Sequence, residues 1–146
     1  MPFPFSSTEI LTADAMNSLP WGLMGYGINT SPPTLSTTEQ NIVSVTFTAE
    51  TGRLYLAIAQ LNANTFNAAG ALFMKIYAPS RISEGSIPAP STSLDFCGCT
   101  ISGYFTGSGS ITVDFRAQVL AGATSANVGT AGTTDPYLLV QDVGPS

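Results

Sequence analysis

The sequence contains no histidine and few charged residues. Of its 146 residues, 4 are Lys or Arg and 9 are Asp or Glu, so charged residues are 9% of the chain, against about 25% in typical soluble domains. Without histidine, the chain lacks the commonest general base and the commonest metal ligand. The net charge of -5 also excludes the basic footprint that nucleic-acid binding requires.

Cysteine is scarce as well. Cys97 and Cys99 stand in the run FCGC, a spacing that would strain a disulfide between them and supplies too few ligands for zinc. We interpret them as two small, half-buried thiols. Residues 1–17 carry Glu9 and Asp14 and no basic segment, so we expect no signal peptide. We also expect no membrane span, because no apolar run approaches the roughly 20 residues that one needs.

Hydrophobic residues make up 44% of the chain, and Ser, Thr and Gly supply most of the remainder. Proteins that are free in solution normally rely on surface charge for solubility. A weakly charged surface rich in Ser, Thr and Gly is therefore typical of a chain whose surface is covered by partners.

Period-2 alternation of apolar and polar residues dominates the chain from residue 22 onward. Short alternating segments separated by Gly, Ser, Thr and Pro predict an all-β fold. We expect residues 22–146 to form an antiparallel β-sandwich of jelly-roll type with about eight strands. The predicted strands are 24–30, 42–49, 53–61, 71–78, 93–97, 100–106, 111–120 and 137–143.

The alternation also predicts the core and the turns. Tight turns are expected at residues 50–52 and 107–109, where glycine permits them, and the three prolines of residues 79–93 predict a long exposed loop. The residues expected in the core are Val45, Phe47, Leu56, Ile58, Val113 and Phe115.

Two of the predicted strands are apolar on both faces. Opposite the expected core face, one strand carries Tyr55, Ala57, Ala59 and Leu61, and the other carries Leu72, Met74 and Ile76. Either these strands are central and covered by loops or by the N-terminal segment, or they pack against identical neighbours. The second alternative predicts a homo-oligomer, with a homotrimer as the expected form.

Residues 1–21 predict an N-terminal attachment arm. Thr12 is a good N-cap, and Leu11 and Met16 stand at the positions of a hydrophobic staple, which predicts a short helix at 13–18. A helix this short must dock on another surface to be stable. The residues expected to attach the arm are Phe3, Phe5, Leu11, Met16, Leu19 and Trp21.

The sequence offers little material for catalysis. It has no nucleophile elbow, phosphate-binding loop or zinc-protease motif, and we expect no catalytic residue, cofactor or metal. Asp95, Asp114 and Asp142 could serve a glycosidase only if folding brought two of them together. Asp114 and Arg116 share one strand face and predict a solvated ion pair. Trp21 and the five tyrosines could stack on sugars, although aromatic residues in strands usually serve packing.

Two stretches carry a resemblance to a known class of proteins. The run ILTADAMN at 10–17 and the closing run PYLLVQDVGPS at 136–146 resemble segments of small structural proteins of tailed-bacteriophage virions, of the capsid-decoration, head-fibre or minor-tail type. The resemblance implies a non-enzymatic virion protein, assembled in the bacterial host cytoplasm and attached to the capsid or tail surface. Its implied partners are further copies of itself, in a homotrimer, and capsid or tail proteins, without nucleic acid or membrane.

The alternative function is a carbohydrate-binding module that recognises a glycan of the host surface. The position of Trp21 disfavours a dedicated sugar platform, because the chain's single tryptophan lies in the predicted arm.

Overall fold

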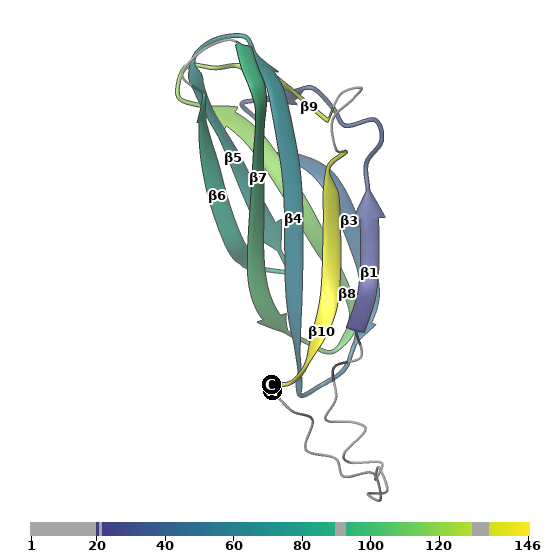
Figure 1. The fold of residues 1–146 in the computed structure, drawn as a ribbon. Helices are drawn as coiled ribbons and strands as arrows, with labels where there is room; N and C mark the ends of the chain where they lie inside the picture. Colours follow the sequence, from purple (N-terminus) through teal and green to yellow (C-terminus); the bar gives the residue numbers. More distant parts are fainter. Residues whose placement is uncertain (1–19, 21, 90–92, 130–134) are drawn as a thin grey trace, which may run out of the picture.

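The structure, a computed structural model, describes residue 20 and residues 22–89, 93–129 and 135–146, and within these it contains strands and no helix. Two antiparallel sheets pack face to face as a sandwich (Figure 1). The strands are β1 (Gly22–Ile28), β2 (Leu35–Ser36), β3 (Gln40–Ala49), β4 (Arg53–Phe66), β5 (Gly70–Tyr77), β6 (Arg81–Ala89), β7 (Ser93–Thr106), β8 (Gly109–Leu120), β9 (Ser125–Val128) and β10 (Tyr137–Pro145).

The two sheets divide the strands unequally. The six-stranded sheet has the order β1-β10-β4-β9-β2. The sixth strand, β7, pairs with β4 along the edge opposite to β10. The four-stranded sheet has the order β3-β8-β5-β6. The six-stranded sheet, with β1, β10, β4 and β7 side by side, forms the front layer of Figure 1. The all-β antiparallel prediction is therefore confirmed at the level of two packed sheets.

The core lies between the sheets and contains most of the residues predicted for it. On β3 and β8 every second side chain points inward, as the alternation predicted, because successive side chains of a strand point to opposite faces. Phe115 and Val113 are fully buried. On the neighbouring strand β3, the buried Val45 pairs with Val113 and the buried Phe47 pairs with Ile111. These four core predictions are confirmed.

The face predicted for β4 is wrong. Leu56 and Ile58 were expected in the core, but both are half-buried on the outer side of the sheet. The side chains that point into the core are Tyr55, Ala57, Ala59 and Leu61, all with 0% exposure. On β5 the inner face consists of Leu72, Met74 and Ile76, also at 0%. Both faces that were expected to be covered by loops, by the N-terminal segment or by identical neighbours are therefore covered by the facing sheet of the same chain.

An aromatic cluster explains why β4 turns this way. The ring of Tyr55 lies 5.1 Å from that of Phe47 and 5.5 Å from that of Phe105, measured between centroids. Its hydroxyl oxygen accepts a hydrogen bond from the backbone N–H of Glu50 at 2.8 Å, so the polar atom is satisfied. The alanines that follow present little bulk where the sheets meet. Tyr55, whose hydroxyl group is hydrogen-bonded, and the alanines after it can therefore occupy the inner face of β4. Leu56 and Ile58 then lie on the outer face.

Glycines bring β1 close to the facing sheet. A Cβ atom added to Gly25 would lie 2.3 Å from Cγ1 of Val45, and one added to Gly27 would lie 2.7 Å from Cγ1 of Val43. The absence of side chains at these two positions therefore lets β1 pack over β3 and close that edge of the sandwich.

The remaining differences from the sequence prediction concern strand number and the N-terminus. Residues 81–89, expected in a loop, form β6, and the predicted strands at 93–97 and 100–106 are one strand, β7. The short β2 and β9 were not predicted. The turn at 50–52 is confirmed, with φ of +80° at Gly52. The predicted helix at 13–18 lies outside the described residues.

Candidate functional site

The outer side of the six-stranded sheet is apolar across four strands. Residues paired in the register share a face, which aligns Leu23 with Gln141, Leu56 and Tyr104 in one row, and Tyr26 with Leu139, Ile58 and Ser102 in the next. We call this surface the apolar face. Its large side chains are Leu23, Tyr26 and Ile28 on β1, Tyr137, Leu139 and Val143 on β10, Leu54, Leu56 and Ile58 on β4, and Tyr104 on β7.

The strongest exposure of large hydrophobic residues falls on this face. Leu23 is 60% exposed, Tyr26 55%, Ile28 49% and Tyr104 62%. The polar residues among the described positions of β4, β7 and β10 on this face are uncharged, being Gln, Asn, Ser and Thr. The large hydrophobic residues that are exposed among the described residues therefore gather on this one face.

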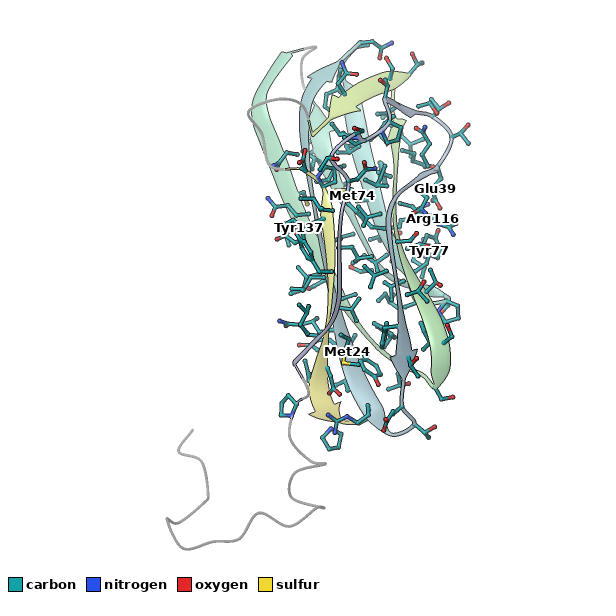
Figure 2. The ribbon with its side chains drawn as sticks, turned by 90° about the vertical axis from the view of Figure 1, so that its right-hand side faces the viewer. Met24, Glu39, Met74, Tyr77, Arg116 and Tyr137 are labelled. Carbon is teal, nitrogen blue, oxygen red and sulfur yellow. The ribbon has the colours of Figure 1, made fainter. Side chains whose placement is uncertain are left out.

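The opposite side of the sandwich carries the charges. Lys75, Asp114 and Arg116 lie on the outer side of β5 and β8, and Glu39 precedes β3 beside them. Figure 2 shows Glu39, Tyr77 and Arg116 together on one side, Tyr137 on the other, and Met74 between the sheets. The two outer faces therefore differ in character, one charged and one apolar.

The Glu39 carboxylate lies between two cations, Lys75 and Arg116, that are neighbours on adjacent strands. Lys75 and Arg116 are paired in the register of β5 and β8, a position in which like charges repel. The Glu39 carboxylate accepts a hydrogen bond from Lys75 at 2.5 Å, and its other oxygen lies 3.7 Å from Arg116. Arg116 also pairs with Asp114 at 2.6 Å and stacks on the Tyr77 ring. The ion pair predicted between Asp114 and Arg116 is thus one part of a larger network.

We expect this network to make the protein's stability depend on pH in acid. The Lys75 ammonium, through its hydrogen bond, holds the pKa of Glu39 below its usual 4.5, so the folded state favours the carboxylate. Its contribution is complete above pH 4.5 and is lost as the pH falls through the lowered pKa. We expect Glu39→Gln to remove about 1 kcal/mol or less near neutral pH and to flatten the acid limb of the unfolding free energy.

Urea denaturation of the natural protein and of Glu39→Gln between pH 2 and 7 measures how the unfolding free energy depends on pH. Glu84→Gln is the matched control, because Glu84 belongs to an exposed pair with Arg81. An acid limb that is unchanged in Glu39→Gln would contradict the prediction.

A buried ion pair lies at the end of the sandwich where β4 begins and β10 ends. Arg53 and Asp142 are 5% and 2% exposed, and Nη2 of Arg53 lies 2.7 Å from Oδ2 of Asp142. The Nε–H of Arg53 donates to the same oxygen at 2.8 Å, and the N–H of Gly144 donates to Oδ1 at 2.7 Å. This arrangement fixes the start of β4 against the end of β10, next to Gly22, where the chain enters β1.

The structure does not bring the candidate carboxylates together. Asp114 lies on the outer side of the four-stranded sheet, and Asp142 is buried on the inner side of the other sheet with Arg53. The side chain of Asp95 is not described. Within the described residues, no group of three or more His, Cys, Asp or Glu side chains could hold a metal ion.

The other predicted site residues fall in two groups. Cys99 is half-buried and packs against the core, and the side chain of Cys97 is not described. The attachment residues Phe3, Phe5, Leu11, Met16, Leu19 and Trp21 all lie outside the described residues. In the part of the chain that the structure describes, no helix is long and apolar enough to cross a membrane.

Sequence reasoning missed most of the apolar face. Leu56 and Ile58 were assigned to the core because large aliphatic residues usually lie there. A signal was nevertheless present: Tyr137, Leu139 and Val143 alternate with Leu138 and Val140 in the last strand, so one apolar set of that strand had to face outward.

Comparisons with known proteins give no family. No protein-family model matches the sequence, and no curated protein matches it. Among solved structures, the chain is similar to the C-terminal domain of EclA, described as a sugar-binding protein, with 17% identity over 96% of this chain and 88% of that one and a TM-score of 0.44. It is also similar to the tripod (BppUct-A-L) from the baseplate of bacteriophage Tuc2009, with 16% identity over 99% of this chain and 71% of that one and a TM-score of 0.42. TM-scores this low carry no argument about function, which rests on the chain's own residues.

Proposed function

We propose that this chain is a non-enzymatic structural protein of a bacteriophage virion, acting as a homo-oligomer on the capsid or tail surface. The apolar face carries the proposal, because four strands present uncharged apolar side chains where a free monomer would place charges. A component of a larger assembly can keep such a face buried. The resemblance of residues 10–17 and 136–146 to phage virion proteins supports a virion as the assembly.

We also assign the sandwich to the jelly-roll type. Its antiparallel pairs are nested along the chain: β1 pairs with β10, β3 with β8, β4 with β7, and β5 with β6. A long hairpin that is wrapped around itself in this way is the arrangement of a jelly roll, which is common in virion proteins.

The ion pairs that the charged side chains form support a structural role. All 4 Lys and Arg side chains of the sequence take part in ion pairs. Glu39, Asp114 and Asp142 are held by these cations, so three of the carboxylates that could serve acid–base chemistry instead stabilise the sandwich.

We assign attachment to residues 1–21. The chain enters β1 at Gly22, opposite Asp142 and next to the C-terminal end of β10, so the arm leaves the sandwich at this end. The apolar arm residues Phe3, Phe5, Leu11, Met16, Leu19 and Trp21 would bind a capsid or tail protein, with several arms of one oligomer acting together.

We expect deletion of residues 1–21 to abolish incorporation into the virion and to leave a folded, self-associating sandwich. The reason is that every described strand begins at or after Gly22. Mass spectrometry of purified particles measures the copy number of the protein, where many copies indicate capsid decoration and few indicate a tail component.

Two variants of the full chain serve as a matched pair for this test. Phe3→Asp with Phe5→Asp should reduce incorporation, and Ser6→Asp with Ser7→Asp should leave it unchanged. Equal incorporation of the deletion variant and the natural chain would show that attachment runs through the sandwich instead.

A carbohydrate-binding module is the second candidate function, favoured by one observation. The rings of Tyr26 and Tyr137 lie 6.1 Å apart on the apolar face at an interplanar angle of 36°, and Tyr26 is 55% exposed. Such a pair offers stacking surface to a sugar ring. Binding to a glycan array that is lost in Tyr26→Ala would favour this function over the first.

A further inference from the structure

We infer that the apolar face binds further copies of this same chain, flank to flank around a three-fold axis. This inference rests on the proposed function, because it names the partner that covers the face in the homo-oligomer. Its first basis is the position of the exposed groups: Leu23, Tyr26 and Ile28 form one flank on β1, and Tyr104 forms the other flank on β7.

The area of the face fits an interface between proteins. A tyrosine side chain buries roughly 150–250 Å², and more than half of each of Tyr26 and Tyr104 is exposed. With Leu23, Ile28 and the half-buried side chains between the flanks, the face presents apolar surface on the order of 600 Å². A standard interface takes about 800 Å² from each partner. In a ring the apolar face is shared between two interfaces, so it supplies the apolar core of each, and the polar residues around it supply the rim.

The chemistry of the face favours a second copy over a glycan. Sugars carry hydroxyl groups that need hydrogen-bond partners, and burying them against aliphatic side chains is costly. Leu54, Leu56 and Ile58 form an aliphatic row at the centre of the face. Interfaces between identical subunits, by contrast, are more apolar than other interfaces and depleted of charge at their core.

The distribution of charge defines the orientation of the protomers. With the apolar face toward the axis, Glu39, Lys75, Asp114 and Arg116 on the opposite side remain in solvent, where charges favour solubility. Contact between the β1 flank of one protomer and the β7 flank of the next is heterologous, and heterologous contacts close into a ring only with three copies or more, three being the smallest number. Both flanks are exposed in the single chain, as this arrangement requires.

Light scattering on the purified full-length protein tests the inference. We expect a mass of three times the 15.1 kDa of one chain at micromolar concentration. Tyr26→Asp and Tyr104→Asp should each weaken association by at least about 30-fold, as expected for a central interface residue, and yield monomers. Thr48→Asp is the matched control, because Thr48 is exposed on the outer side of β3 and should leave the trimer intact.

Circular dichroism melting verifies that each variant is folded, and Leu23→Ser replaces any aspartate variant that is not. Trimers that persist in both tyrosine variants, or a two-chain mass for the natural protein, would overturn the three-fold arrangement. A natural monomer that binds a hydrophobic dye only after removal of residues 1–21 would show that the chain covers its own face, and would overturn the inference. Loss of the trimer in folded tyrosine variants that still enter particles would support the interface and place attachment elsewhere.

The two proposals can fail separately. A natural protein that is monomeric in solution and in purified particles would overturn the interface and leave the virion role standing. A trimer that is absent from purified particles would support the interface and contradict the virion role.

Discussion

Phe115→Ala is expected to cost about 3–5 kcal/mol of unfolding free energy, the usual loss for a buried phenylalanine. Phe115 is 0% exposed and lies on β8, where it pairs with Val43 on one side and Ile76 on the other. It thus fills the centre of the four-stranded sheet's inner face. Its removal leaves a cavity that close-packed neighbours can fill only in part. Urea denaturation at one fixed protein concentration measures the loss.

Phe73→Ala provides the comparison on the same sheet. Phe73 is half-buried on the outer side of β5, so its truncation removes less packing and leaves no internal cavity. We expect its cost to be smaller by at least about 2 kcal/mol. A loss below about 1 kcal/mol for Phe115→Ala would mean that the opposite face of β8 points into the core.

The strands that could be predicted from the sequence are those with one apolar and one polar face. On β3 and β8, polar residues such as Ser, Thr, Asp and Gln alternate with apolar residues such as Val, Ile and Phe, so only one orientation buries apolar surface. A shift of one residue would expose the whole apolar set. The turns at Gly52 and Gly109 were predictable for a similar reason, because both adopt positive φ angles that favour glycine.

The orientation of β4 could not be predicted, because both of its faces are apolar. Local pattern cannot choose between Leu54, Leu56 and Ile58 on one side and Tyr55, Ala57 and Ala59 on the other. The choice depends on tertiary contacts: Tyr55 pairs with Phe105, which lies far along the chain on β7, and packs on Phe47 of the facing sheet. The outer face of β4 is thus apolar, but it consists of residues that were predicted for the core, and its contact with partners stays a prediction.

The strand β6 was missed because proline and glycine are poor strand formers. Pro88 and Gly85 lie within it, yet β6 is an edge strand that pairs with β5 alone, a position in which proline is tolerated. Gly85 is needed at its position, since a Cβ atom there would lie 2.6 Å from Cγ2 of Ile101. These residues therefore mark a close approach of the two sheets at this edge.

Asp142→Ala is expected to destabilise the sandwich by about 3–5 kcal/mol, the typical cost of removing one partner of a buried ion pair. The substitution would leave the Arg53 guanidinium, which is 5% exposed, without its carboxylate in the interior. It would also remove the acceptor of the Gly144 N–H. Denaturation in urea at neutral pH measures the cost, and Asp114→Ala is the control, expected to lose about 1 kcal/mol or less because Asp114 pairs near the surface.

A double variant separates the charge from the packing. Replacing the pair by Arg53→Met with Asp142→Leu removes both charges and keeps apolar volume, so it should recover a large part of the loss seen in Asp142→Ala. Recovery would show that most of the cost comes from stranding the arginine rather than from losing the pair. A double variant as unstable as Asp142→Ala would mean instead that the hydrogen bonds of Asp142, including the one from Gly144, hold the end of β10 against β4. In both outcomes the affected region is the end at which Gly22 leads into β1, so the same measurements report how firmly the base of the proposed attachment arm is held.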